Sequence, residues 1–231
     1  MKTLTQHIEE RLIINKNFKQ KEVFKPNTAQ ELQDYVNSRV DELIKNNENV
    51  LDMSNVDISL LKSNSSRFKP LYQIFKEPFK KIRKKNITVD VSHWDITGFA
   101  RIDCIFFECE CIETIKGLET WDVSDVGDFA GLFSQCSNLK NVNVSGWKLK
   151  NSNTLLAMFY GCENLKKIDG IDTWDFGDNR RIEMANMFYE CHNLNDIGDI
   201  EYWVSNAGDC SGMFYKCNHT IIPKWYRERY K

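Results

Sequence analysis

One spacing constrains this chain more than any other feature. The motif F-x-x-C occurs five times, with successive cysteines 27, 26, 29 and 26 residues apart. The five pairs are Phe106/Cys109, Phe133/Cys136, Phe159/Cys162, Phe188/Cys191 and Phe214/Cys217. A unit this short cannot bury its own apolar residues, so neighbouring units must stack to form a core. The sequence therefore predicts an α/β repeat solenoid with five units over residues 94–222.

The residues before each cysteine have a helical period. Apolar side chains stand at i, i+3, i+4 and i+7, as in Ile102, Ile105, Phe106 and Cys109. This spacing predicts one buried helix face in each unit. Acidic residues that fit the first turn of such a helix are Asp128, Glu183 and Asp209.

The residues after each cysteine change to the pattern C-x-x-L-x-x-I, which is typical of a short, half-buried strand. The apolar pairs are Ile112/Ile115, Leu139/Val142, Leu165/Ile168 and Leu194/Ile197. Stacked units would align these strands as a narrow parallel sheet. Asn138, Asn164 and Asn193 suit a left-handed turn between helix and strand, because asparagine tolerates that geometry.

A tryptophan recurs in each unit, and together with the cysteines it predicts a stacked structural ladder. The tryptophans are Trp94, Trp121, Trp147, Trp174 and Trp203. An aromatic ladder is also a possible ligand platform, but its strict periodicity with the core residues favours packing. The repeat cysteines are interpreted as reduced, buried apolar positions of the same ladder; they are Cys109, Cys136, Cys162, Cys191 and Cys217.

These motifs resemble a known family. W-D-V-S-x-V before M-F-x-x-C-x-x-L, closest at Trp121–Val126, is similar to the BspA-like leucine-rich repeats of bacterial surface proteins, mycoplasma lipoproteins and gut-phage proteins. The pattern departs at residues 147–150 and 203–205, where the aspartate is missing, and residues 51–56 with 89–92 suggest a degenerate earlier unit. The resemblance implies a curved leucine-rich-repeat array that binds protein, without catalysis.

The ends of the chain are expected to cover the repeat core. Residues 1–50 are predicted to form a helical cap, 51–93 a degenerate repeat and basic linker, and 223–231 a C-terminal cap with Trp225, Tyr226 and Tyr230. The clearest helix spans 28–47, where Thr28 and Glu31 form a capping box. Its apolar face is expected to consist of Leu32, Tyr35, Val36, Val40, Leu43 and Ile44.

Charge divides the chain in two. Residues 1–88 carry 17 Lys and Arg against 11 Asp and Glu, whereas residues 89–231 carry 14 against 22. An acidic repeat array argues against nucleic acid as a partner. The basic run Lys76, Lys80, Lys81, Arg83, Lys84 and Lys85 is interpreted as a solvated face, with an electrostatic contact as the alternative.

No catalytic or metal motif is readable, so no enzyme, cofactor or metal is predicted. Cys104, Cys109 and Cys111 with His93 lack the paired C-x-x-C spacing of a zinc site. The four histidines occupy different positions within the repeat. A cysteine nucleophile is the disfavoured alternative, because every repeated cysteine has the same structural explanation.

Binding is instead expected on the inner, concave side of the sheet. The polar residues that flank buried strand positions are Asn141, Asn143, Lys167, Asp169 and Asp196. Tyr160, Tyr189 and Tyr215 each follow the repeat phenylalanine and are expected to line an outer face. The partner is predicted to be another protein.

Two further hypotheses come from the ends and from the family resemblance. MKTLTQHIEE resembles the capsid-targeting peptide of head-internal phage proteins, although Gln6 and His7 depart from it, so a phage-particle protein is one alternative. A bacterial surface adhesin is the other. No signal peptide and no apolar segment of roughly 18 residues is visible, so we expect a cytoplasmic or phage-particle location and no membrane span.

Overall fold

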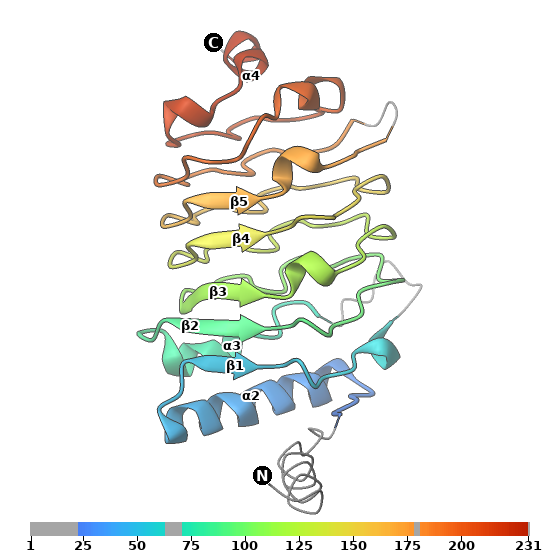
Figure 1. Cartoon of the computed structure of the whole chain (residues 1–231), viewed down its shortest axis with the longest axis vertical. Coiled ribbons are helices and arrows are strands. Elements are labelled where there is room, and N and C mark those ends of the chain that lie inside the picture. The colour runs from blue at the N-terminus through green and yellow to red at the C-terminus, as the bar shows by residue number, and fades with distance from the viewer. Residues whose placement is uncertain (1–22, 63–70, 178–180, 231) are drawn as a thin grey trace, which may run out of the picture.

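Stacked coils of the chain form the molecule. The computed structural model describes residues 23–62, 71–177 and 181–230, and in them successive coils lie one above another along the long axis (Figure 1). Together they build a five-stranded parallel sheet in the order β1-β2-β3-β4-β5. The strands are β1 (Val50–Asp52), β2 (Ile87–Asp90), β3 (Ile112–Lys116), β4 (Asn141–Asn143) and β5 (Lys167–Asp169). The predicted parallel sheet of short strands is confirmed.

Strands β3, β4 and β5 lie where the apolar pattern after the first three repeat cysteines predicts them. Val142 pairs with Ile168 across β4 and β5, and both side chains are buried. The fourth predicted strand, around Leu194 and Ile197, is reduced to a single bridge between Lys167 and Asp196. Upstream, β1 and β2 extend the same sheet through residues 50–52 and 87–90.

The helices predicted before each cysteine are not formed. The segments 102–109, 129–136, 155–162, 184–191 and 210–217 are chains of consecutive turns, which we call the turn column. Two residues four positions apart in each segment have positive φ, a conformation that an α-helix cannot contain. The pairs are Cys104/Glu108, Gly131/Gln135, Ala157/Gly161, Asn186/Glu190 and Gly212/Lys216.

Hydrogen bonds between coils explain why the turns replace helices. Alternate N–H groups of one segment donate to the next coil: those of Phe129, Gly131, Phe133 and Gln135 donate to the carbonyls of Thr154, Leu156, Met158 and Tyr160 at 2.7 to 3.1 Å. The N–H groups between them close turns onto the residue three positions earlier, as Ser134 does onto Gly131 at 3.0 Å. Every second donor is thereby satisfied by a neighbouring coil rather than by a helix. The apolar positions remain buried, as the sequence indicates.

The polar residues assigned to helix ends have other roles. Asp128 accepts a hydrogen bond from the Ala130 N–H at 2.9 Å and so opens a turn rather than a helix. The three asparagines do not adopt positive φ. Instead each Nδ2 donates to a carbonyl of the preceding coil, at 2.7 Å from Asn138 to Glu110, 2.9 Å from Asn164 to Ser137 and 2.8 Å from Asn193 to Glu163. They tie one coil to the next.

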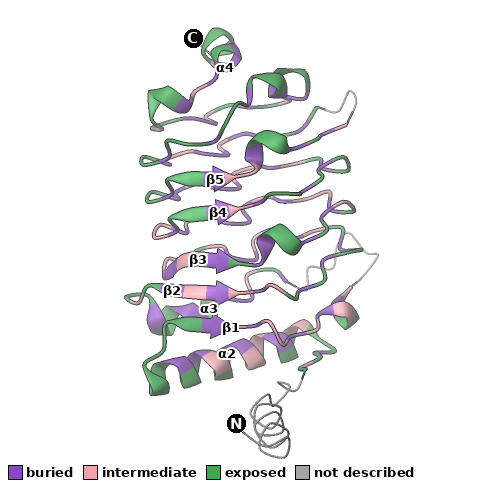
Figure 2. Ribbon diagram, viewed as in Figure 1, coloured by how far each residue is buried: buried purple, intermediate pink, exposed green. Residues whose placement is uncertain are grey.

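Aromatic stacks run through the core, whose buried residues recur in successive coils (Figure 2). The phenylalanines before the cysteines stack in one file from Phe106 to Phe214, with ring centroids 5.2 to 5.7 Å apart. Phe75 extends this file toward the N-terminal end, 5.2 Å from Phe106. The buried file makes each coil depend on its neighbours for packing.

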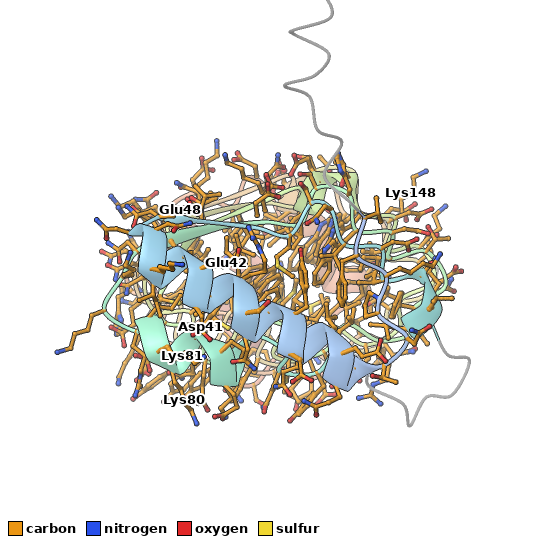
Figure 3. All side chains as sticks on the ribbon, turned by 90° about the horizontal axis from the view of Figure 1, so that it is seen from below. Asp41, Glu42, Glu48, Lys80, Lys81 and Lys148 are labelled. Carbon is orange, nitrogen blue, oxygen red and sulfur yellow. The ribbon has the colours of Figure 1, made fainter. Side chains whose placement is uncertain are left out.

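A long helix closes the N-terminal end of the stack (Figures 1 and 3). Helix α2 (Ala29–Asn46) packs against β1 and α3 (Lys76–Phe79). Thr28 accepts the Glu31 N–H at 3.1 Å, but the Glu31 carboxylate accepts from Asn27 N rather than closing the box on Thr28. Four of the expected apolar residues are buried, whereas Tyr35 is half-buried and Ile44 is 43% exposed.

A short helix closes the other end. In α4 (Lys224–Arg229), Trp225 is buried and Arg229 donates to the carbonyls of Ala207 and Gly208 at 3.2 and 3.0 Å. The Cys210 N–H donates to the Tyr230 hydroxyl at 3.1 Å. The remaining helices in the described residues are short 3-10 helices: Ser59–Leu61, Lys80–Ile82, Leu118–Thr120, Ile171–Thr173, Glu201–Ser205 and His219–Ile221.

Candidate functional site

The solvent side of the parallel sheet carries most of the residues predicted to bind. The strand register aligns Val50, Thr88, Thr114, Asn141, Lys167 and Asp196 in one row. A second row begins with Asp52, Asp90 and Lys116 and continues with Asn143 and Asp169. All of these side chains are exposed or half-exposed, and together we call them the sheet face (Figure 2).

Three of the predicted residues form one charged group on the sheet face. The Lys167 Nζ lies 2.8 Å from an Asp169 carboxylate oxygen and 3.5 Å from one of Asp196. Each of the three side chains is about half exposed. The hydrogen bond to Asp169 raises the pKa of Lys167 above its ordinary value, so the ammonium stays charged. The group presents one positive and two negative charges to solvent.

Asn143 has a structural role that its sequence position did not reveal. Its Oδ1 accepts from both the N–H and the hydroxyl of Ser145, at 3.1 and 2.6 Å. Asp52 makes the same contacts with Ser54 at 3.0 and 2.6 Å. This D/N-x-S pattern ends the strands of three coils with a tight turn. Asn141, on the neighbouring row, is exposed on the sheet face.

The binding residues predicted from the sequence leave out the N-terminal part of the sheet face. Val50, Thr88 and Thr114 continue the row of Asn141 and Lys167, and Val50 is 45% exposed. The signal that reveals them is alternation, because each flanks a buried residue such as Leu51 or Val89.

The tryptophans and cysteines of the ladder lie inside the coils. Neighbouring tryptophan rings from Trp94 to Trp203 stack with centroids 5.8 to 6.3 Å apart and interplanar angles of 2 to 5°. The first three indoles donate to carbonyls of an earlier coil, as Trp147 does to Leu118 at 2.7 Å. All five are buried, so their ring faces contact one another rather than solvent.

The cysteine thiols make contacts of the same kind. Cys136, Cys162, Cys191 and Cys217 each donate to the carbonyl of the phenylalanine one coil earlier, at 2.8 to 3.1 Å. Burial raises the pKa of the Cys136 and Cys162 thiols well above the ordinary value. Thiols in this state stay protonated at neutral pH, whereas a nucleophilic cysteine needs a lowered pKa.

The basic run of residues 76–85 is paired within the molecule. Lys81 of the run contacts Asp41 of α2 at 2.7 Å (Figure 3). Arg83 contacts Glu110 at 2.6 Å. Lys76 lies 3.1 Å from Glu108, and Lys80 lies 2.6 Å from Glu77. The sequence interpretation of a solvated face is therefore incomplete, because carboxylates of α2, α3 and the first repeat pair with four of the six cations in the run.

A tyrosine file lines the outside of the turn column, as the sequence predicts. Tyr160 and Tyr189 stack at 4.8 Å, and Tyr189 and Tyr215 at 4.7 Å. Lys216 lies over the Tyr215 ring at 5.5 Å and also pairs with Glu190 at 2.6 Å. The rings cover one another, so only the outermost ring, Tyr215, is more than half exposed.

Residues 23–62, 71–177 and 181–230 hold no group of three or more His, Cys, Asp or Glu side chains placed to bind a metal ion. Among the helices in those same ranges, none is long and apolar enough to cross a membrane. Residues 1–10, which carry the phage-like motif, lie outside the described part of the chain.

Comparison with known proteins places the chain in a family. The family described as "Mycoplasma protein of unknown function, DUF285" matches residues 73–196 and, in a second overlapping match, 169–225. No curated protein matches the chain, and no solved structure matches it. The matched segments contain the repeat cysteines, four strands of the sheet (β2 to β5) and the whole turn column. Since they span more than half of the sequence, the chain belongs to the DUF285 family.

Proposed function

We propose that this chain is a non-enzymatic protein-binding module, a BspA-like leucine-rich-repeat solenoid that contacts its partner through the sheet face. The observation that carries the proposal is the charged group of Lys167, Asp169 and Asp196, held in register on a rigid backbone. Ordered, solvated charges of both signs suit recognition of a partner with complementary charges.

The scaffold behind this face supports the proposal. Ile168, between the two charged residues of β5, is buried, and its N–H donates to Asp196 O at 3.2 Å. The backbone that carries the charges is therefore held by the buried Ile168 side chain beneath it and by hydrogen bonds to both neighbouring coils. Fixed side chains lose less conformational freedom on binding, which favours affinity.

A charge swap tests the assignment. In the double variant Lys167→Asp/Asp169→Lys the ion pair between positions 167 and 169 is retained in the reverse direction, whereas the contact between position 167 and Asp196 becomes repulsive. We expect affinity purification with mass spectrometry to recover a partner with the wild-type protein and to lose it with this variant. The Kd of the isolated partner, measured by calorimetry, should rise by about tenfold or more.

The control is a second ion pair away from the sheet face. Glu190→Lys/Lys216→Glu reverses the pair on the turn column and should leave the partner's Kd unchanged. Thermal unfolding of both variants should match wild type, because exposed ion pairs contribute about 1 kcal/mol or less. An unaltered Kd in the sheet-face variant would remove the proposal.

The phage-particle and adhesin hypotheses remain predictions of the sequence. They concern where the module works, whereas the charge swap tests how it binds. Mass spectrometry of purified phage particles from the source strain would detect the chain in the first case. Protease shaving of intact cells would release its peptides in the second case.

A further inference from the structure

The parallel sheet ends at Ile197 without a following strand. In the preceding coil Ile168 stands six residues after its repeat cysteine, and its N–H donates to Asp196 O of the next coil at 3.2 Å. Ile197 stands at the same position after Cys191. Among the residues that the structure describes, its N–H and C=O have no hydrogen-bond partner. The last edge of the sheet is therefore open.

The chain that should supply the next strand forms a 3-10 helix instead. Asn218 accepts the Thr220 N–H on its side chain at 3.0 Å and the Ile221 N–H on its carbonyl at 3.3 Å. These bonds close the 3-10 helix His219–Ile221, and Pro223 follows it. A cavity of about 320 Å³ remains between residues 195–201 and 220–223.

Acidic side chains dominate the rim of this cavity. Asp196, Asp199 and Glu201 line it, with Arg227 as the single cation among the lining residues. Asp199 and Glu201 each use one carboxylate oxygen for a local N–H, from Glu201 at 2.9 Å and from Lys224 at 2.7 Å. Both side chains lie on exposed residues, so their charge stays available to a ligand.

We propose that this edge binds an extended, basic segment of a partner protein, which adds one strand beside Asp196 and Ile197. The main chain of such a segment satisfies the unpaired groups of Ile197, as in strand addition to other exposed edges. Lysine or arginine side chains at alternate positions face the carboxylates of the rim. The site shares Asp196 with the charged group of the proposed function, but the open Ile197 edge and the carboxylates of Asp199 and Glu201 lie outside that group, so strand addition is tested independently of the proposed function.

A second copy of this chain fits the edge less well. The opposite edge of the sheet, at β1, is covered by α2, which blocks head-to-tail addition of another molecule. If two Ile197 edges met, Asp196, Asp199 and Glu201 of both molecules would face each other. Like charges at such close range oppose association.

Three synthetic peptides on the full-length protein test the proposal. The first alternates Lys and Val over six residues, the second replaces each Lys by Glu, and the third is the basic peptide with N-methyl groups on alternate amides. We expect fluorescence anisotropy to show saturable binding of the first peptide, and at least tenfold weaker binding of the other two. Equal binding of the N-methylated peptide would exclude strand addition, and equal binding of the Glu peptide would exclude the acidic rim; either result overturns the proposal.

A charge-neutral variant localises the binding. Asp199→Asn/Glu201→Gln keeps both local acceptors and removes two charges, so we expect the affinity for the basic peptide to fall about threefold to tenfold. The matched control, Asp34→Asn/Glu48→Gln, removes two exposed charges near α2 and should leave the affinity unchanged. Equal loss in both variants would show non-specific attraction. A stable dimer in sedimentation analysis without peptide would assign the edge to a second copy and would also overturn the proposal.

Discussion

The Cys162 thiol donates a hydrogen bond to the carbonyl oxygen of Phe133, 3.1 Å away in the preceding coil. The same relationship links Cys136 to Phe106 and Cys191 to Phe159. Each of these three cysteines therefore fills apolar space and adds a second hydrogen bond to a carbonyl one coil away, which already accepts an N–H of its own coil. This dual role explains why the F-x-x-C motif recurs with the period of the fold.

Removing one thiol should weaken the stack. We expect Cys162→Ala to lower the free energy of unfolding by about 1 to 3 kcal/mol, because it leaves a small cavity and removes one of the two hydrogen bonds that the Phe133 carbonyl accepts. Urea denaturation monitored by tryptophan fluorescence measures the change. Cys104→Ala serves as comparison, since Cys104 is only partly buried, and an equal loss there would contradict the special role of the ladder.

The buried thiols should make the protein less stable in alkali. Burial raises the pKa of Cys111 to about 12, whereas an unfolded cysteine ionises near pH 8.5. Its contribution to stability is complete below that pH and declines as pH rises from about 9 toward 12, because only the unfolded state releases the proton. The free energy of unfolding of wild type should fall more steeply over this range than that of Cys111→Ala. Parallel curves would show that the thiol does not contribute.

Two glycines allow the free-energy cost of a left-handed backbone to be measured separately from the cost of steric crowding by a Cβ. Gly170 and Gly146 have φ of +82° and +85°, but a Cβ on Gly170 would lie 2.5 Å from the Ser145 Cα, whereas one on Gly146 has no neighbour nearer than 3.9 Å. Gly146→Ala should cost about 1 kcal/mol from the left-handed backbone alone. Gly170→Ala should cost at least about 3 kcal/mol, since two coils must move apart. Thermal unfolding that shifts equally in both variants would contradict this difference.

Replacing Ser152 by a residue with a smaller side chain should stabilise the protein. Its side chain is fully buried, and its hydroxyl has no hydrogen-bond partner among the described residues. The preceding coil has Val126 at the same distance after its tryptophan. Ser152→Ala should raise the free energy of unfolding by about 1 kcal/mol, because a buried unsatisfied hydroxyl is costly. A loss of stability would show that the hydroxyl has a partner in solution.

The sequence by itself determined which residues are buried and where the strands begin. The cysteine, phenylalanine and tryptophan positions, the strands after Cys109, Cys136 and Cys162, and the helix begun at Thr28 all follow from spacing and from local capping. These features depend on the side chains and on short-range hydrogen bonds. The residues Lys167, Asp169 and Asp196 were also predictable as solvent-facing neighbours, because they flank buried strand positions.

Only the tertiary structure decided the backbone before each cysteine and the end of the sheet. An apolar period of three to four residues fits a helix and a chain of turns equally well, and the carbonyls of the next coil, such as Leu156 O facing Gly131 N, select the turns. The open edge at Ile197 arises likewise from a partner strand that the C-terminal segment does not supply. Such outcomes depend on hydrogen bonds between residues more than twenty positions apart, which no local pattern in the sequence specifies.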